Sequence, residues 1–276
     1  MSHKTKILDL GNPEDLEVKI FPAGEVNVRV IDPIEWKSSY EIIAVLKEPK
    51  DIMVLLLTNN ALRHKGVRNI SLTLEYIPYC RQDNIFNEGE ALSIEVMANL
   101  INSCKFDRVK TLDPHSKSAA YLINNLVVKE RSFYVNECVR ILSTEDEVFL
   151  VSPDIGSYKT TYNIKKYIAK EQPSKDVKVI SFMKGRSSDN GIGELKCTEN
   201  IDLTGKQIFV SDDICDSGGT LLRVGKALKE MGAEKLYLFV SHGVFSKGLD
   251  ELMKMYVSIF TTRSYSSLQH RDLFYI

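Results

Sequence analysis

Short apolar runs alternate with segments of helical spacing along almost the whole chain, and this alternation is the strongest constraint on its fold. Runs such as residues 177–182 and 235–240 have the length and the Val, Ile, Phe and Tyr content of buried strands. Intervening segments such as residues 93–104 and 220–231 repeat apolar side chains at helical spacing. Because parallel strands need long crossover connections, the pattern predicts an α/β fold in which mainly parallel sheets are flanked by helices.

The alternation restarts after about residue 140, where the polar residues 143–147 precede the apolar run 148–151. A chain of 276 residues is long enough for two domains of ordinary size. We therefore expect an N-terminal domain over residues 1–140 and a C-terminal domain over residues 141–276. Each half contains a strand that ends in an acidic turn, which is compatible with two related, Rossmann-like halves.

Composition argues against several classes of protein and site. The formal net charge is −1, so long-range attraction to nucleic acid or to an anionic membrane is not expected, and a phosphate must be held by local groups. The five cysteines are scattered and lack CxxC spacing, which argues against a disulfide framework and against a zinc site. No apolar stretch approaches the ~20 residues that span a bilayer, and the N-terminus has no signal-peptide pattern. We expect a cytoplasmic protein.

The segment of residues 211–220 has the composition of a loop that binds a phosphate and a sugar. The apolar run 206–210 brings Asp212 and Asp213 to the end of a strand, which is the end at which open α/β sheets bind ligands. Asp216 then begins the sequence Asp-Ser-Gly-Gly-Thr, which leads into a helix. The first turn of that helix points free amide groups at the loop.

Each residue type in this loop suits one part of a ribose phosphate. Gly218 and Gly219 allow positive φ and a close approach of the backbone, while Ser217 and Thr220 add hydroxyl donors. A phosphate dianion can therefore bind without a basic residue. The two aspartates before the loop can accept hydrogen bonds from vicinal ribose hydroxyls, or they can hold Mg²⁺. The sequence thus predicts a site for a phosphoribosyl group.

The order of apolar strand, paired acids, glycine-rich loop and helix resembles the phosphoribosyl pyrophosphate loop of type I phosphoribosyltransferases and of ribose-phosphate pyrophosphokinases. The loop by itself does not distinguish these families. Three segments of the N-terminal half resemble pyrophosphokinase motifs. Residues 21–25 resemble the Phe-x-Asp-Gly-Glu turn, residues 79–83 the Tyr-x-Arg-Gln-Asp motif, and residues 113–116 the Asp-Leu/Pro-His-Ser/Ala turn. A transferase would need neither the second nor the third.

The resemblance to the pyrophosphokinases implies two tandem phosphoribosyltransferase-like domains and an ATP-dependent reaction. The residues that it implies for ATP binding are Phe21, Glu25, Arg81, Gln82 and Asp83. It places His115 at the Mg-ATP site, where His115 and Asp154 are the residues expected to reach Mg²⁺. The acceptor would be held by the residues of the acidic strand end and loop, namely Asp212, Asp213, Asp216, Ser217, Gly218, Gly219 and Thr220.

Two further segments of the C-terminal half resemble loops of the same family. Asp154 and Gly156 belong to a sequence similar to the family's Pro-Asp-x-Gly loop, which implies contacts with the diphosphate and the sugar. Lys184 and Arg186 resemble the Lys-x-Arg start of a mobile catalytic loop. Two cations on such an arm can neutralise charge that develops on the transferring phosphate.

The expected reaction is transfer of the diphosphate of Mg-ATP to the anomeric hydroxyl of ribose 5-phosphate, giving phosphoribosyl pyrophosphate and AMP, in a homo-oligomer with shared ATP sites. Ala23, Asn84 and Ser157 depart from the usual family pattern, and the chain is shorter than typical members. These departures leave open a larger acceptor such as ADP-ribose, and they predict reduced allosteric regulation. The activity of a type I phosphoribosyltransferase and the role of a non-catalytic regulatory relative also stay open.

Overall fold

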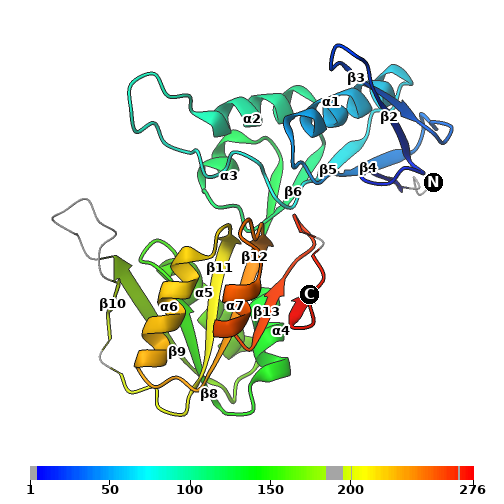
Figure 1. The fold of residues 1–276 in the computed structure, drawn as a ribbon. Helices are drawn as coiled ribbons and strands as arrows, with labels where there is room; N and C mark the ends of the chain where they lie inside the picture. The colour runs from blue at the N-terminus through cyan, green and yellow to red at the C-terminus, as the bar shows by residue number, and fades with distance from the viewer. Residues whose placement is uncertain (1–4, 185–194, 200, 267) are drawn as a thin grey trace. The chain divides into compact units, whose positions relative to one another are not determined.

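The structure is a computed structural model that describes residues 5–184, 195–199, 201–266 and 268–276. The chain forms two compact units, Met1–Lys129 and Glu130–Ile276. Each unit contains a mainly parallel sheet with flanking helices (Figure 1), which confirms the fold class predicted from the alternation. Among the residues described, none of the helices combines the length and the apolar character needed to span a bilayer.

The first unit is built on a five-stranded parallel sheet in the order β1-β4-β5-β6-β7. Its strands are β1 (Thr5–Asp9), β4 (Ser39–Ile43), β5 (Ile70–Thr73), β6 (Arg108–Leu112) and β7 (Leu126–Lys129). Its helices are α1 (Pro49–His64), α2 (Ser93–Ser103) and α3 (Ser118–Leu122). Separately from the sheet, β2 (Leu16–Ile20) and β3 (Val26–Val30) form an antiparallel hairpin.

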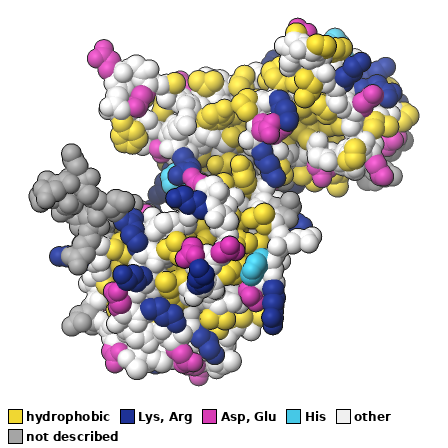
Figure 2. Space-filling view, viewed as in Figure 1, with side chains coloured by type: hydrophobic (Ala, Val, Ile, Leu, Met, Phe, Trp, Pro, Cys, Tyr) yellow, Lys and Arg dark blue, Asp and Glu magenta, His cyan; other side chains and the backbone are white. Residues whose placement is uncertain are grey.

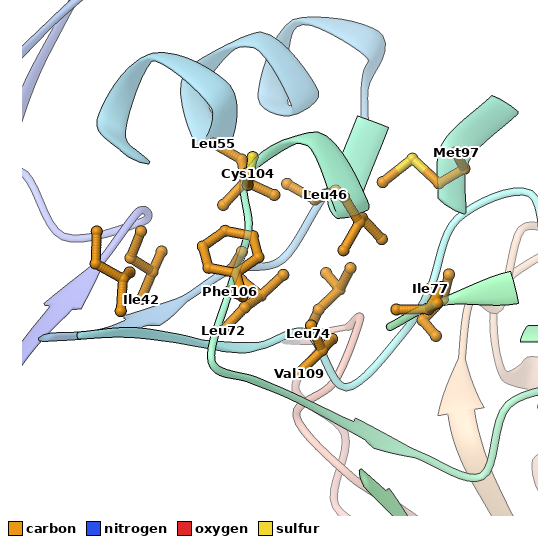
Figure 3. Close-up of a cluster of buried hydrophobic side chains, with 14 of the residues drawn as sticks. Ile42, Leu46, Leu55, Leu72, Leu74, Ile77, Met97, Cys104, Phe106 and Val109 are labelled. Atoms are coloured by element: carbon orange, nitrogen blue, oxygen red, sulfur yellow. The ribbon is translucent and has the colours of Figure 1, made fainter. Parts of the chain in front are cut away.

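The core of the first unit lies between the sheet and its helices (Figure 3). Ile42, Leu72 and Val109 come from the three neighbouring strands β4, β5 and β6, and all three are fully buried. Leu55 of α1 and Met97 of α2 belong to the same buried cluster. Burial of these side chains fixes the register of the strands, because a slip by one residue would turn the apolar set to the other face.

The second unit contains a seven-stranded sheet in the order β10-β9-β8-β11-β12-β13-β14, in which only β10 is antiparallel to its neighbour. Its strands are β8 (Glu147–Ser152), β9 (Asp176–Lys184), β10 (Leu195–Cys197), β11 (Gln207–Cys215), β12 (Lys235–Gly243), β13 (Ser258–Thr261) and β14 (Leu273–Tyr275). Its helices are α4 (Ser132–Leu142), α5 (Tyr158–Glu171), α6 (Gly219–Glu230) and α7 (Asp250–Met255).

The helices of the second unit cover both faces of its sheet. Val240 of β12 packs in one cluster with Leu221 of α6 and Leu252 of α7. The ring of the preceding residue, Phe239, stacks on Tyr134 of α4 with centroids 6.0 Å apart. Successive strand residues point to opposite faces, so α4 lies on the face opposite to α6 and α7. Acidic and basic side chains are interspersed over the face of this unit that Figure 2 shows.

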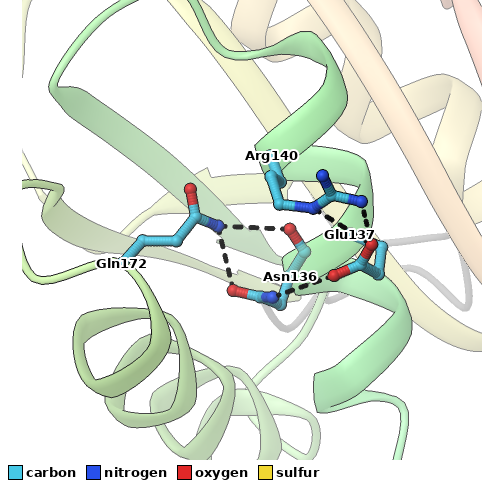
Figure 4. Close-up of polar contacts among 4 residues, drawn as sticks. All are labelled: Asn136, Glu137, Arg140 and Gln172. Atoms are coloured by element: carbon cyan, nitrogen blue, oxygen red, sulfur yellow. Dashed lines mark hydrogen bonds and ion pairs between the residues drawn. The ribbon is translucent and has the colours of Figure 1, made fainter.

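Helix α4 belongs to the second unit, although the sequence did not lead us to expect a helix there. Gln172, just after α5, donates from Nε2 to Asn136 Oδ1 of α4 at 2.9 Å, and Arg140 Nε donates to Glu137 Oε2 within α4 at 3.1 Å (Figure 4). The contacts therefore divide the chain between residues 129 and 130. The sequence placed the change between residues 140 and 141, because the polar residues that follow α4 were the visible signal.

Strand β11 is longer than its apolar run. The sequence predicted a strand over residues 206–210 followed by a loop from Ser211, whereas the structure continues the strand to Cys215. The reason is backbone pairing with β12, in which Asp212 lies opposite Val240 and Ile214 opposite His242. The two aspartates are therefore strand residues, and the loop itself is short.

Candidate active site

Asp212 and Asp213 lie side by side at the carboxyl end of β11, and each residue keeps a small exposed surface. The Asp213 amide donates to Asp212 Oδ1 at 3.0 Å, and the Ile214 amide donates to Asp213 Oδ1 at 2.7 Å. Burial of the carboxyl and the charge of Asp213 raise the pKa of Asp212 well above its ordinary value, while the guanidinium of Arg131 partly opposes the shift. The pair is thus a concentrated acidic site on a rigid strand.

The loop after β11 leads directly into α6. Gly218 is the N-cap residue of this helix and has a left-handed conformation, with φ of 76°, and a Cβ at this position would lie 3.1 Å from Leu252 Cδ1. No side chain caps the helix, so the amides of its first turn are available to a ligand. Ser217 and Gly219 are exposed and Thr220 is half-buried. The predicted phosphate-binding residues therefore do surround the start of a helix.

The turn after β8 carries Asp154 and Gly156 and is held by hydroxyl groups. The Ser157 amide donates to Asp154 Oδ1 at 3.0 Å, and Ser152 Oγ donates to the Asp154 carbonyl at 2.6 Å. Ser152 Oγ and Ser157 Oγ are 2.7 Å apart, so the two hydroxyls support each other. Ser157, which departs from the family pattern, has become a structural part of this turn.

Three predicted segments lie at neighbouring strand ends in the second unit. Val210 of β11 pairs with Val151 of β8, and Ser152 pairs with Ser181 of β9, so the parallel strands present their carboxyl ends at one edge of the sheet. The acidic pair lies in the last residues of β11, the Asp154 turn follows β8, and Lys184 ends β9. Arg186 lies outside the described residues.

The predicted ATP residues of the second motif lie in the long segment between β5 and α2 of the first unit. The Gln82 amide donates to the Tyr79 carbonyl at 2.9 Å, and the Gln82 carbonyl accepts from the Ile94 amide at 3.3 Å. Asp83 Oδ1 accepts a hydrogen bond of 2.8 Å from Asn84 Nδ2. Arg81 and Gln82 are exposed. The backbone of this segment is fixed while its polar side chains reach solvent.

The acidic turn of the first unit follows β6, the strand next to β5. Asp113 has a φ of 38°, which is unusual for a residue other than glycine, and its amide donates to the Lys129 carbonyl at 2.8 Å. His115 is exposed, and the buried hydroxyl of Ser116 accepts from the Ser118 amide at 3.0 Å. The backbone conformation places His115 on the surface just after the strand.

Phe21 and Glu25 close the β2–β3 hairpin. The Phe21 amide donates to the Glu25 carbonyl at 2.9 Å, and the Gly24 amide donates to the Phe21 carbonyl at 2.8 Å. Gly24 has a φ of 87°. The Phe21 ring is 40% exposed, and Lys19 Nζ lies 5.3 Å from its centroid. The hairpin tip therefore presents an aromatic face for stacking.

No three metal-binding side chains cluster within the part of the chain that the structure describes. The two residues predicted to reach Mg²⁺, His115 and Asp154, belong to different units. Mg²⁺ usually keeps several waters and binds one or two carboxylates together with substrate phosphates, so a preformed cage is not required. Asp154 uses Oδ1 for the Ser157 amide and has Oδ2 as a second oxygen, which fits a metal held mainly by a bound nucleotide.

Several residues that shape the site carry no motif that sequence analysis could use. Arg131 is 2% exposed and influences Asp212, yet it is a lone arginine far away in the sequence. The Ser152 hydroxyl supports the Asp154 turn from inside a strand. Ser246 binds Asp216 through Oγ at 2.6 Å. Ser152 and Ser246 lie at or just after strand ends, which could have suggested them, whereas Arg131 is the N-cap residue of α4 and has no such signal.

Comparison with known proteins gives matches to both halves of the chain. Residues 9–104 match the N-terminal domain of ribose phosphate pyrophosphokinase, and residues 130–265 match the phosphoribosyl transferase domain. The ribose-phosphate pyrophosphokinase of Mycoplasmopsis pulmonis is 30% identical over 234 residues, which cover 84% of this chain and 70% of the relative. That of Pyrococcus furiosus is 29% identical over 245 residues, which cover 86% of this chain and 81% of the relative.

A solved structure of another protein matches almost the whole chain. The phosphoribosylpyrophosphate synthetase from Mycobacterium smegmatis superimposes with a TM-score of 0.82 over 99% of this chain and 94% of that chain, at 19% sequence identity. At this identity the likeness concerns the fold.

Proposed function

The chain belongs to the ribose-phosphate pyrophosphokinase family, and on this premise we propose that it transfers the β,γ-diphosphate of Mg-ATP to the anomeric hydroxyl of ribose 5-phosphate. In this reaction the C1 oxygen forms a bond to the β-phosphorus and loses its proton, and the bond between the β-phosphorus and the oxygen bridging to the α-phosphate breaks. AMP leaves, and phosphoribosyl pyrophosphate forms. The observation that carries the proposal is the acidic end of β11, followed directly by an uncapped helix N-terminus.

The acceptor half of the proposed site lies in the second unit. The amides of Gly219 and Thr220, together with the Ser217 and Thr220 hydroxyls, are the proposed donors to the 5-phosphate. Asp212 and Asp213 are the proposed acceptors for the ribose hydroxyls. Asp216 is proposed to contact the bound ribose phosphate as well. Such a site positions the anomeric hydroxyl, and positioning is most of what a phosphoryl transfer requires of a protein.

The donor half of the proposed site draws on the first unit. Phe21 offers a face for the adenine, Glu25, Gln82 and Asp83 offer hydrogen-bonding groups, and Arg81 offers a planar cation for a phosphate. When bound with ATP, Mg²⁺ would neutralise charge on the triphosphate, with His115 and Asp154 as the proposed protein contacts. We propose a homo-oligomer in which the hairpin tip of one copy helps to complete the ATP site of another.

Lys184 and Arg186 are the proposed catalytic cations. Lys184 ends β9, next to the strand that carries the Asp154 turn. A cation delivered from this strand end would neutralise the charge that develops on the transferring β-phosphate.

The proposed co-substrates are soluble metabolites, so the cytoplasm is the proposed location.

A larger acceptor is the second candidate, and the exposure of the loop favours it. Ser217 and Gly219 are exposed, so one oxygen of a bound 5-phosphate would face solvent and leave room for an ester such as ADP-ribose. Transfer to ADP-ribose would follow the same chemistry at C1 and would release the same AMP. The two acceptors therefore differ only in what the bound phosphate carries.

The decisive experiment supplies Mg-ATP with ribose 5-phosphate or with ADP-ribose and separates the products by mass. We expect one sugar to gain a diphosphate, with one AMP released for each product formed. A reaction that instead consumes phosphoribosyl pyrophosphate and a nucleobase without ATP would identify a phosphoribosyltransferase. If neither sugar gains a diphosphate and the protein instead binds and alters an active synthetase, its role is regulatory. Omission of the sugar controls for simple ATP hydrolysis.

A further inference from the structure

The turn that follows β12 holds the first residues of the acceptor loop. The Val244 and Phe245 amides both donate to the Cys215 carbonyl, at 2.9 and 3.0 Å, and the Ser246 amide donates to the Asp216 carbonyl at 3.1 Å. Ser246 Oγ also donates to Asp216 Oδ1 at 2.6 Å. The direction of the chain where β11 ends, and the direction of the Asp216 carboxylate, are therefore set from outside the loop.

This turn has little freedom of its own. Phe245 has a φ of 49°, and its ring is buried in the core of the second unit. Gly243 lies against that ring, because a Cβ at this position would be 2.1 Å from Phe245 Cε2. A non-glycine residue in this conformation persists only where its surroundings hold it. A displacement of the strand end before the turn would therefore also displace the acceptor loop that the turn holds.

His242 anchors the strand end from which the turn starts. Its side chain is 1% exposed, and its Nδ1 lies 2.6 Å from Ser264 Oγ, beyond the end of β13. In the sheet His242 lies opposite Ile214, and the next pair joins Cys215 to Gly243. The histidine is thus one residue before the turn and in register with the strand that carries the loop.

A count of protons indicates which nitrogen of His242 carries hydrogen. Ser264 Oγ has three close neighbours: His242 Nδ1, Thr262 Oγ1 at 2.9 Å and the Ser241 carbonyl at 3.1 Å. Thr262 Oγ1 lies 2.7 Å from the same carbonyl. Each hydroxyl has one proton and the carbonyl has none. Suppose that Nδ1–H donates to Ser264, Ser264 donates to Thr262 and Thr262 donates to the Ser241 carbonyl. Then only the 3.1 Å contact between Ser264 and that carbonyl has no proton to share. Among these four contacts, hydrogen on Nδ1 leaves the fewest without a proton.

We propose that His242 is a positioning residue for the acceptor loop, acting through the turn of residues 243–246. Loss of its bond to Ser264 would let the turn move, and the Cys215 and Asp216 groups that the turn holds would move with it. The amides at the start of α6 would then miss the 5-phosphate, whereas ATP binding would not change. The inference rests on the proposed function for the identity of the ligand, but not for the anchoring itself.

Two replacements of His242 test this role. His242→Asn keeps an N–H donor near the position of Nδ1, whereas His242→Gln moves the donor farther along the side chain. We expect His242→Gln to weaken binding of ribose 5-phosphate, measured by calorimetry without ATP, by about tenfold, as does loss of one buried hydrogen bond. We expect His242→Asn to stay within about twofold of the wild type. ATP affinity should be unchanged in both variants.

Amide hydrogen exchange of the unliganded protein separates anchoring from general destabilisation. Exchange across residues 215–222 should be faster in His242→Gln and in Ser246→Ala than in the wild type and His242→Asn. Thr58→Val is the matched control, because it removes a buried hydroxyl bond of 2.8 Å to the Val54 carbonyl in the first unit. Unchanged exchange in His242→Gln, or equal acceleration in the control, would overturn the proposal. If the wild type binds no ribose 5-phosphate, the proposed function fails while the exchange comparison still decides the anchoring.

Discussion

Both units are built on a mainly parallel sheet flanked by helices, but the ends of their strands carry different kinds of candidate binding groups. In the second unit the short loop after β11 runs straight into α6, so backbone amides converge at one point. In the first unit the candidate groups are side chains on the hairpin tip, on the long segment between β5 and α2 and on the turn after β6. Converging amides suit a compact phosphate, whereas separated side chains suit an extended nucleotide. The comparison therefore supports the proposed division, in which the second unit binds the acceptor and the first unit binds ATP.

The largest effect that we expect comes from Lys184→Ala in the second unit. Loss of this proposed cation should lower turnover on the order of 10²–10³-fold, because its proposed contact forms only as charge develops on the transferring phosphate. Binding of both substrates should change little. Steady-state kinetics with both substrates saturating, together with calorimetric titration, would measure the two quantities.

Lys178→Ala provides a matched control for this cation on the same strand. Lys178 also lies on β9, but it forms an ion pair with Glu147 away from the strand's carboxyl end. Its replacement should leave turnover within about twofold of the wild type, as expected for an exposed pair. Equal rates for Lys184→Ala and Lys178→Ala would remove Lys184 from the mechanism.

The next effect tests the assignment of ATP to the first unit. Arg81→Lys keeps the charge but loses the planar, forked set of donors, so the KM for ATP should rise by roughly ten- to a hundredfold. The KM for the sugar phosphate should not follow it. Arg108→Lys, at the amino end of β6, is the control because that residue is exposed and distant along the strand from the acidic turn. A parallel rise in both KM values would contradict the proposal that the first unit binds ATP and the second unit binds the sugar phosphate.

Two glycines with positive φ sharpen the comparison further. Gly218→Ala forces a side chain into a left-handed position and towards Leu252, whereas Gly24→Ala meets no atom within 4 Å. Each should cost about 1–2 kcal/mol of backbone strain, with Gly218→Ala the more costly. We expect Gly218→Ala to raise the KM for the sugar phosphate and Gly24→Ala to raise the KM for ATP. Urea unfolding would measure the cost in stability. If Gly218→Ala instead raised the KM for ATP and Gly24→Ala raised the KM for the sugar phosphate, the proposed roles of the two units would be contradicted.

The sequence predicted the α/β class and the helix after the loop because apolar periodicity reports directly on burial. It stopped β11 at Val210, since pairing of Asp212 with Val240 depends on the neighbouring strand and leaves no apolar signal. It also missed α4, which packs on α5 in the second unit. The contact between His242 and Ser264 could not be predicted for a similar reason, because only the order of strands in the sheet brings these residues together. The contacts of Ser152 are local, with Asp154 and Ser157, but a serine in an apolar strand carries no signal for them.

The smallest effect that we expect is a gain in stability from Asp212→Asn. The folded-state pKa of Asp212 is raised, so its favourable contribution is complete only below the unfolded value of about 3.9 and is lost as the pH rises through the folded value. At pH 7 the replacement should therefore increase the free energy of unfolding, while weakening binding of the sugar. The gain should disappear below about pH 4, and Asp176→Asn at an exposed position should show none. Urea unfolding across this pH range measures both variants, and a gain that grows towards low pH would contradict the buried-pair explanation of the acidic site.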